Sequence, residues 1–227
     1  MALLLLLSLL TCPAAAGSLS DAATVPGSLI SGAAPAPGRL GLTDDDAATV
    51  RGRVLAELTP SLATPQLDRE LDVLLLPSLN ATGMWPDVAY ADGGRSWWGA
   101  AEHLRRCLLL ASAFNSPHSP HHLSPTVLAA LESSFRWWLT TDPQNSNWWW
   151  MQFGVVRTVC KILLLLPEHA ASPLLPLAEP LLARTPESLE AKWTGCNRVW
   201  FASIHVLRGA IELNSTRVRL HLTLTSH

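Results

Sequence analysis

The amino-acid sequence predicts an all-α fold whose helices pair as antiparallel hairpins. Three observations support this prediction. After residue 44, apolar residues recur every three or four positions, which is the spacing of one face of an α-helix. Ser-Pro and Thr-Pro pairs precede several of these stretches, and short connections that often contain proline separate them. Because a short connection leaves successive helices side by side, neighbouring helices should pack as hairpins.

The first 43 residues are expected to lie outside the helical domain. Residues 2–10 are nearly all leucine and small residues follow at 14–17, so residues 1–17 are interpreted as a secretory signal peptide. A membrane anchor is the alternative, but the apolar run is far shorter than the ~20 residues that span a bilayer. Residues 18–43 are rich in Ala, Gly, Pro and Ser, which predicts a disordered linker. The sequence therefore predicts a secreted protein with its domain at 44–213.

Four stretches of the domain carry helical periodicity, and four dipeptides predict helix starts. The apolar stripes are Trp97, Ala101, Leu104, Leu108 and Ala111; Leu128, Leu131, Phe135 and Trp138; Trp149, Phe153, Val156, Cys160 and Leu163; and Val199, Ala202, Val206 and Leu213. The helix starts are predicted at Thr64-Pro65, Ser124-Pro125, Ser172-Pro173 and Thr185-Pro186. Each pair places a hydroxyl at the N-cap and a proline at the first helical position, where the missing N–H costs nothing.

Residues 214–227 break the helical pattern. Val218, Leu220, Leu222 and Leu224 alternate with polar residues, which is the periodicity of a β-strand. A lone strand has no partner for its backbone, so we expect an exposed edge or a disordered, irregular tail. The change of pattern favours a chain that stops early or continues into sequence foreign to its domain.

Tryptophan is the most informative residue type. The chain has ten tryptophans and one tyrosine, and seven of the tryptophans form the doublets at 97–98 and 137–138 and the triplet at 148–150. Indole faces pack against the C–H faces of sugar rings, although a single tryptophan more often packs in a core. Neighbours on a helix point about 100° apart, so one core rarely buries a whole triplet. We expect at least one indole of each cluster to face a groove.

Composition and the remaining motifs exclude several classes of function. A net charge of −2 argues against nucleic-acid binding. Cys107, Cys160 and Cys196 lie in apolar stretches without metal-ligand spacing, and the His-rich loop at 118–122 has no nearby cysteine or carboxylate, so neither a metal nor a cofactor is predicted. Asn80 and Asn214 begin sequons that are available for N-glycosylation in a eukaryotic secretory route.

Three ordered motifs resemble the polysaccharide lyase family 8 enzymes, which include hyaluronate, chondroitin AC and xanthan lyases. The first is WPDVAYAD at 85–92, followed by Trp98 and HLRR at 103–106. The second, NWWWMQFGVVR at 147–157, is similar to the family's NWWxxEIGxPR signature, with Gln152 in place of Glu, Phe153 in place of Ile and Val156 in place of Pro. The third, TGCNRV at 194–199, matches the TGxN segment. Together they cover roughly residues 45–213.

The resemblance implies a fold and half of an active site. The fold would be an incomplete (α/α) toroid with a glycan cleft on its inner face. The reaction would be β-elimination, in which the C5 proton of a uronic acid is removed and the C4 oxygen leaves. Asn197 matches the family's asparagine, whose amide N–H groups hydrogen-bond the uronate carboxylate near a helix N-terminus. The alternative is that Asn197 only caps that helix.

The other predicted site residues would bind substrate. Trp148 and Trp149 would form the sugar-stacking platform, with Asn147 and Gln152 as hydrogen-bonding neighbours and Arg198 beside Asn197. The arginines either steer an acidic polysaccharide or form surface ion pairs, and both interpretations stay open. These arginines are Arg95, Arg105, Arg106, Arg157 and Arg198.

The family's downstream His, Tyr and Arg have no counterpart in this sequence. Tyr90 belongs to the first motif, and His205 and His221 match no catalytic histidine of the family. Without a base and a proton donor, the chain alone is expected to be inactive or nearly so. The predicted protein is therefore a monomeric, lyase-like binder of acidic polysaccharide. The alternatives are a secreted glycan-binding protein without catalysis, and an incomplete gene product that neither binds nor cleaves.

Overall fold

The computed structural model describes residues 46–62, 65–188 and 194–223, and these residues form helices, turns and loops without a strand. The predicted signal peptide at 1–17 and linker at 18–43 lie outside the described residues. The elements are α2 (Asp46–Leu62), α3 (Pro65–Glu70), η2 (Leu71–Leu75), α4 (Leu76–Ser78), α5 (Ala101–Asn115), α6 (Pro125–Thr141), η3 (Trp150–Gly154), α7 (Val155–Leu165), α8 (Glu168–Ala171), α9 (Leu175–Leu182), α10 (Cys196–Ile211) and α11 (Ser215–Thr223). The all-α prediction is confirmed.

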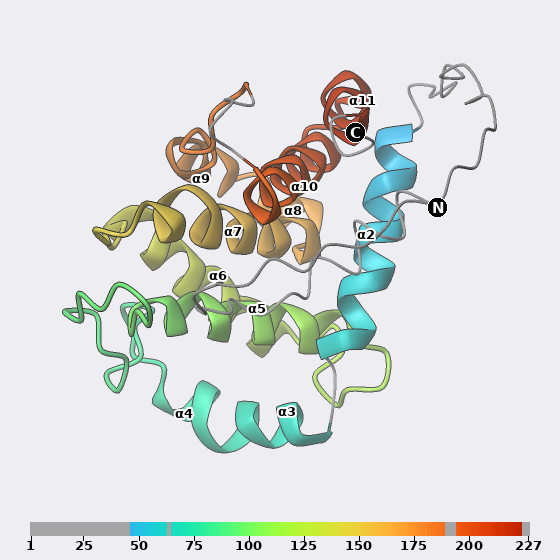
Figure 1. The fold of residues 1–227 in the computed structure, drawn as a ribbon. Coiled ribbons are helices and arrows are strands. Elements are labelled where there is room, and N and C mark those ends of the chain that lie inside the picture. Colours follow the sequence, from blue (N-terminus) through green and yellow to red (C-terminus); the bar gives the residue numbers. More distant parts are fainter. Residues whose placement is uncertain (1–45, 63–64, 189–193, 224–227) are drawn as a thin grey trace, which may run out of the picture.

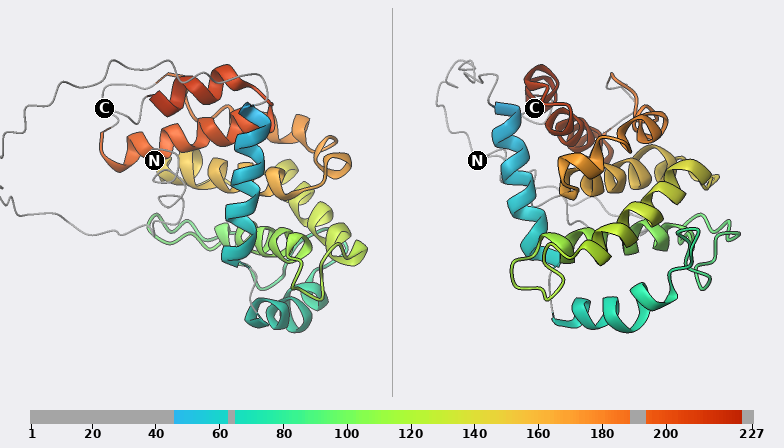
Figure 2. Two further views of the ribbon diagram at one scale, coloured as in Figure 1. Left: turned by 90° about the vertical axis from the view of Figure 1, so that its right-hand side faces the viewer. Right: turned by 180° about the vertical axis from the view of Figure 1, so that it is seen from behind.

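The helices form stacked hairpins, as an incomplete (α/α) toroid requires. The pairs are α5 with α6, α7 with α9, and α10 with α11 (Figure 1). Within the stack, α5 packs on α7 and α7 packs on α10, so these three helices form one layer. Helix α2 runs across them and contacts α5, α7, α10 and α11, and the left view of Figure 2 shows it crossing the stack. Within each hairpin the second helix reverses the direction of the first. The first helices of the three hairpins, α5, α7 and α10, therefore run in the same direction.

Helix α7 is the centre of the core because it has neighbours on both sides of the layer. Four of the five residues of its predicted stripe are buried, namely Phe153, Val156, Cys160 and Leu163, whereas Trp149 is half-buried. Ile162 and the leucines that follow it are also buried, so the C-terminal half of α7 is covered all round. A helix that is apolar on every side must lie inside the domain.

Two of the four predicted helix starts are confirmed and two are wrong. Helix α3 begins at Pro65, and the Ser124 hydroxyl caps α6 by accepting from the Val127 N–H at 3.5 Å. Ser172 instead ends α8, and α9 begins at Leu175. Thr185 starts no helix in the residues described up to 188; its hydroxyl donates to the Gln152 carbonyl oxygen at 2.5 Å. That tertiary hydrogen bond takes the hydroxyl that was expected to cap a helix.

The strand and the irregular tail expected from the alternating residues are wrong, because residues 215–223 form α11. Asn214 begins this helix, and its side-chain oxygen accepts from the Arg217 N–H at 3.0 Å. Val218 and His221, which are one turn apart, are buried against α10, whereas Leu220 is 56% exposed. The packing surface therefore has helical and not strand periodicity, and it includes a polar residue that the alternation assigned to solvent.

Gly209 allows α11 to approach α10, and replacing it with alanine should weaken this hairpin. A Cβ atom at Gly209 would lie 2.6 Å from the Val218 Cγ2 atom and 3.2 Å from the Asn214 carbonyl oxygen. We expect Gly209→Ala to lower the free energy of unfolding by about 1–3 kcal/mol, which is typical of overpacking. Gly52→Ala is the matched control, because a Cβ there meets nothing within 4 Å on α2. Urea unfolding should show Gly52→Ala to be neutral or stabilising; equal effects of the two variants would contradict the close approach.

Candidate functional site

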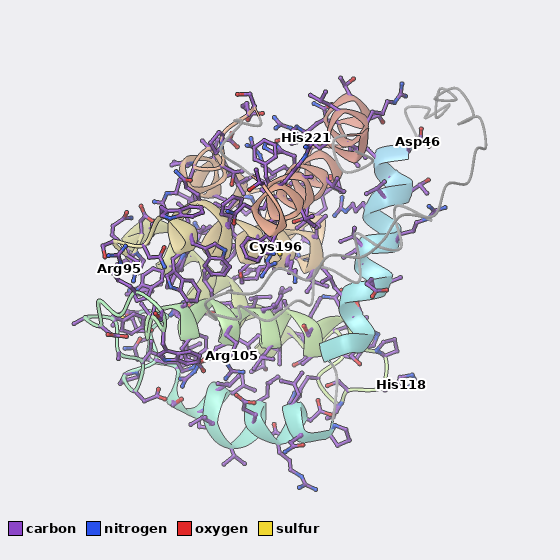
Figure 3. The ribbon with its side chains drawn as sticks, viewed as in Figure 1. Asp46, Arg95, Arg105, His118, Cys196 and His221 are labelled. Atoms are coloured by element: carbon purple, nitrogen blue, oxygen red, sulfur yellow. The ribbon has the colours of Figure 1, made fainter. Side chains whose placement is uncertain are left out.

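Three helix starts lie side by side and form the candidate site. They are the loop before α5 (94–98), the start of the α7 hairpin (147–153) and the start of α10 (195–200), and we call them together the N-terminal edge. The Asn147 side-chain N–H donates to the Arg95 carbonyl oxygen at 2.8 Å, which joins the first two segments. The Trp149 ring lies 5.5 Å from that of Trp200, which joins the second to α10. Figure 3 labels Arg95 and Cys196, which mark the first and third segments.

A continuous series of aromatic contacts runs along this edge. The ring centroids are 5.8 Å apart for Trp98 and Trp150, 5.1 Å for Trp150 and Trp149, and 5.5 Å for Trp149 and Trp200. All three pairs are edge-to-face, the arrangement that aromatic quadrupoles favour. Trp200 was missed as a site residue, although it stands three positions after Asn197 and hence one helical turn away on nearly the same face.

The tryptophan clusters differ in how much indole they expose. Trp97 is 79% exposed and Trp148 is 48% exposed, so two clusters present an indole to solvent as predicted. The doublet at 137–138 has no exposed indole, because Trp138 is fully buried and Trp137 is only partly accessible. Trp137 packs on Tyr90, with ring centroids 4.8 Å apart, which the spacing of a doublet does not reveal.

Trp148 and Trp149 have different environments. Trp148 contacts Phe153 edge-on at 5.7 Å and keeps about half of its surface exposed. Trp149 is half-buried between Trp150 and Trp200, and its indole N–H is buried without a hydrogen-bond acceptor among the described residues. Trp148 therefore offers the more accessible stacking face, and Trp149 forms the wall behind it.

Asn147 organises the edge. Its side-chain oxygen accepts from the Trp149 N–H at 3.0 Å, and its side-chain N–H donates to the Arg95 carbonyl oxygen at 2.8 Å. The Trp150 indole N–H donates to the same carbonyl at 3.1 Å. Asn147 thus fixes the backbone on which Trp148 and Trp149 stand, and both ends of its amide already have protein partners. Its expected contact with a sugar stays a prediction.

Asn197 lies in the first turn of α10, where the backbone dipole favours an anion. The N-cap position belongs to Gly195, at φ +56°, and no side chain caps the helix, so the interpretation of Asn197 as a capping residue is wrong. Among the described residues, the Asn197 amide has no hydrogen-bond partner. Asn197 is half-buried, and it lies on the same helix start as Trp200, whose ring contacts that of Trp149.

Gln152 and Arg198 are the remaining predicted residues. Gln152 is half-buried in the π-helical turn η3, where its carbonyl oxygen accepts from the Thr185 hydroxyl. Arg198 follows Asn197 on α10, is half-buried and has an interaction partner. The N-terminal edge therefore gathers all six predicted positions on two neighbouring helix starts, while their roles toward a ligand stay predictions.

Two of the five arginines form ion pairs and do not face a ligand as free charges. Arg105 contacts Glu102 at 2.6 Å and Glu70 at 2.8 Å. Arg106 forms a bidentate pair with Asp87 at 2.6 and 2.8 Å and also contacts Glu102. The guanidinium of Arg106 holds the pKa of Asp87 below its usual value. For these two arginines the ion-pair interpretation is confirmed.

The WPDVAYAD motif is anchored in the core by Trp85 and Val88, which are buried. Trp85 is fully buried, and its indole N–H donates to the Leu75 carbonyl oxygen at 2.8 Å. The His103 Nε2–H donates to the Ser134 carbonyl oxygen at 2.8 Å, so its Nδ1 accepts from the Tyr90 hydroxyl, also at 2.8 Å. Burial raises the pKa of Tyr90 to about 12 and lowers the pKa of His103 to about 4. Both groups are therefore neutral near pH 7 and have structural partners.

A hollow of about 260 Å³ lies between α5 and the η3–α7 helix. Its lining includes Trp97, Trp98 and Trp150, together with Arg105, Leu108 and Thr158. None of the six predicted site residues lines it. Sequence reasoning missed the hollow because Leu108 and Thr158 have no distinctive motif; only the doublet at 97–98 was a signal.

Two further searches of the described residues give no additional site. No group of three or more His, Cys, Asp or Glu side chains within 46–62, 65–188 and 194–223 is placed to hold a metal ion. In the same part of the chain, none of the helices combines the length and the apolar character that crossing a membrane requires.

Comparison with known proteins identifies the family. The model of polysaccharide lyase family 8, N terminal alpha-helical domain, matches residues 60–224. A chondroitinase AC lyase, solved as oligosaccharide complexes, superposes with a TM-score of 0.65 at 21% identity, over 77% of this chain and 26% of the enzyme. A Paenibacillus xanthan lyase superposes with a TM-score of 0.52 at 18% identity, over 78% of this chain and 18% of the enzyme.

This chain thus spans about a quarter or less of the solved structures that it resembles. No curated protein matches its sequence. The family match covers most of the chain, and the two structural similarities support the same toroid fold. The chain belongs to polysaccharide lyase family 8, as its N-terminal α-helical domain.

Proposed function

We propose that this domain binds an acidic, uronate-containing polysaccharide along the N-terminal edge and is the helical part of a lyase that acts by β-elimination. The main supporting observation is the contact between the Trp149 and Trp200 rings, whose centroids are 5.5 Å apart. This contact brings the segment at 147–153 beside the helix start that holds Asn197. The similarity to a chondroitinase AC lyase solved with oligosaccharides supports the substrate class. Secretion, which the proposal includes, agrees with an apolar N-terminal run followed by small residues.

In this proposal the exposed indole and the amide bind different parts of one sugar chain. Trp148 stacks on the C–H face of a pyranose ring, with Trp149 behind it. The Asn197 amide donates N–H bonds to the uronate carboxylate. Removal of the C5 proton places further negative charge on that carboxylate, so a neutral donor in the first turn of α10 stabilises the transition state more than the ground state.

The described residues place no catalytic base at the edge. The His205 Nε2–H donates to the Pro186 carbonyl oxygen at 2.8 Å, and its ring is stacked on that of His221 inside the α10–α11 hairpin. Tyr90 donates to His103 below the edge. We therefore propose that this chain by itself binds polysaccharide without cleaving it appreciably, because proton transfer by a positioned base contributes about 10²–10⁴ in rate.

The stacking role can be tested by replacing Trp148 with alanine. We expect the affinity for chondroitin, measured by calorimetry, to fall about tenfold or more, because removal of a central aromatic contact commonly costs over 1 kcal/mol of binding free energy. Val73→Ala is the control, since Val73 is an apolar residue that is 79% exposed and lies away from the edge on η2. Unchanged binding by Trp148→Ala would remove the stacking platform from the proposal.

The role of Asn197 needs a ligand control. Asn197→Ala should weaken the binding of chondroitin but leave the binding of carboxyl-reduced chondroitin unchanged, because the amide is assigned to the carboxylate. An equal loss for both polymers would contradict that assignment. Ultraviolet absorbance of the unsaturated uronate product then separates the two candidate activities: binding without absorbance favours the glycan-binding protein, and a steady rise shows a complete lyase.

A further inference from the structure

The hollow between α5 and η3–α7 shares Trp97, Trp98 and Trp150 with the N-terminal edge, but none of the six predicted site residues lines it. Trp150 links the hollow to the predicted stacking residues, because it lines the hollow and its ring contacts the Trp149 ring edge-to-face at 5.1 Å. Trp148, Trp149 and Asn197 do not line it. Its volume of about 260 Å³ is just below the range of about 300–1,000 Å³ that is typical of drug-sized ligands, which suits one sugar ring and not an oligosaccharide.

The walls of the hollow have the chemistry of a sugar site. Trp97, at 79% exposure, keeps a large aromatic surface in water at the rim. Trp98 and Trp150 form an adjoining aromatic wall, with ring centroids 5.8 Å apart, and Thr158 and Glu102 are the lining residues whose side chains carry oxygen atoms. An exposed indole next to a concave aromatic wall is a recognition surface. Contact of its apolar face with water is unfavourable, and a ligand that covers this face removes the unfavourable contact.

The charges around the hollow favour a neutral ring. Arg105, the cation in the lining, is engaged by Glu102 at 2.6 Å and by Glu70 at 2.8 Å. Glu102 also accepts from Arg106, which is itself paired with Asp87. Three carboxylates thus face two guanidinium groups, so a ligand carboxylate would have to displace a carboxylate of the protein. An uncharged ring with hydroxyl groups meets no such opposition.

We infer that the hollow lined by Trp97, Trp98 and Trp150 is a second carbohydrate site, which binds a single neutral pyranose ring. This site extends the glycan surface of the domain from the six predicted residues to the hollow beside α5. Trp97 covers one face of the sugar, the Trp98 and Trp150 wall receives its apolar edge, and the hydroxyl groups hydrogen-bond at Glu102 and Thr158. The inference stands or falls independently of acidic-polysaccharide binding, because none of the residues tested for that function lines the hollow.

The test uses a matched pair of ligands and residue-resolved detection. The full chain, labelled with ¹⁵N at the indole nitrogens, is titrated with methyl β-glucopyranoside and, separately, with its uronate counterpart, which differs in the carboxylate alone. We expect the neutral glycoside to shift the indole signals of Trp97 and Trp150 with a dissociation constant in the millimolar range, and the uronate to bind at least tenfold more weakly. Equal binding of the two ligands would overturn the assignment of a neutral site.

Three variants locate the binding. Trp97→Ala should abolish the shift of the Trp150 signal, and this variant should remain folded because Trp97 is 79% exposed. Thr158→Phe should give the same loss by filling the hollow from the α7 side. Trp148→Ala should bind the neutral glycoside as well as the parent chain does. The inference is overturned if no indole signal shifts, if the shift persists in Trp97→Ala, or if only the signals of Trp148 and Trp149 move.

Discussion

Replacing Trp85 with alanine will lower the free energy of unfolding by about 3–5 kcal/mol, which is the range for removing a large aromatic side chain from a core. Trp85 is fully buried, with its ring edge-on to His103 at a centroid distance of 4.9 Å and the Arg106 guanidinium 5.6 Å from the ring centre. The variant loses these contacts and leaves a cavity. It also leaves the Leu75 carbonyl oxygen without the indole N–H that donates to it at 2.8 Å.

Trp97→Ala is the matched control for this prediction, because it removes the same type of side chain from a position where that side chain is 79% exposed. Urea unfolding followed by circular dichroism should place the two variants several kcal/mol apart, with Trp97→Ala within about 0.5 kcal/mol of the parent chain. In a thermal scan, the loss for Trp85→Ala corresponds to roughly 10 °C in Tm for a domain of this size. Similar midpoints for both variants would mean that Trp85 does not hold η2, α5 and the first motif together.

The helical architecture was predictable because the apolar spacing in the sequence matches the surface that the helices bury. Leu131, Phe135 and Trp138 on α6 show this directly, since the spacing in the sequence is the spacing of the buried surface. The prediction failed where tertiary contacts decide the outcome. In α11 a buried histidine replaces the expected apolar residue, and Thr185 gives its hydroxyl to the backbone of a distant segment. Local spacing contains no information about such partners.

The candidate site was predictable as a set of motifs but not as a geometry. The segments at 147–157 and 194–199 identify the two helix starts, yet only the fold shows that Trp149 meets Trp200 and that Asn147 is held by Arg95. The hollow beside Trp97 was not predictable, because its lining comes from two helices about fifty residues apart and includes side chains of ordinary type, such as Thr158.

Lowering the pH from 7.5 to 4.5 should destabilise the domain by several kcal/mol, and the cause lies in three buried histidines. Burial is the main cause that lowers the pKa of His103, His205 and His221 from the ordinary 6.5 to about 4. The His205 Nε2–H donates to the Pro186 carbonyl oxygen, so its Nδ1 is the acceptor that faces the Arg217 guanidinium at 3.1 Å. A proton added there would meet a cation.

The two histidines of the α10–α11 hairpin share one charged environment. Their rings stack at a centroid distance of 4.0 Å, so a proton on either ring opposes a proton on the other. Arg217 and Arg208 oppose protonation of both rings, and Glu187 favours it only in part. Protonation of the folded hairpin is therefore disfavoured by burial, by the neighbouring imidazole ring and by the two arginines. We expect acid to loosen α11 before the rest of the stack.

The sign of the effect follows from linkage between protonation and unfolding. Above pH 6.5 these imidazoles are neutral in both states and contribute no pH dependence. Between pH 6.5 and 4 the unfolded chain binds protons that the folded chain does not, so each histidine lowers the free energy of unfolding by at most about 3 kcal/mol as the pH falls. The pKa values of Asp87, Glu102 and Glu187 are lowered, so these carboxylates lose their contribution only at more acidic pH.

Thermal unfolding at a series of pH values tests this account, and His221→Phe separates its parts. The parent chain should lose roughly 10–20 °C in Tm between pH 7.5 and 4.5. His221→Phe keeps a flat ring against His205 and Phe201 but removes one titrating group, so its Tm should be close to that of the parent at pH 7.5 and clearly higher at pH 4.5. A parent Tm that is constant down to pH 5, or a variant that loses Tm as steeply as the parent, would show that the stacked pair takes up its proton without unfolding. At pH 7.5, where His221 is neutral, the parent chain and His221→Phe should have similar Tm values. A difference in Tm that develops only at lower pH therefore reports protonation of His221 and not the change in packing.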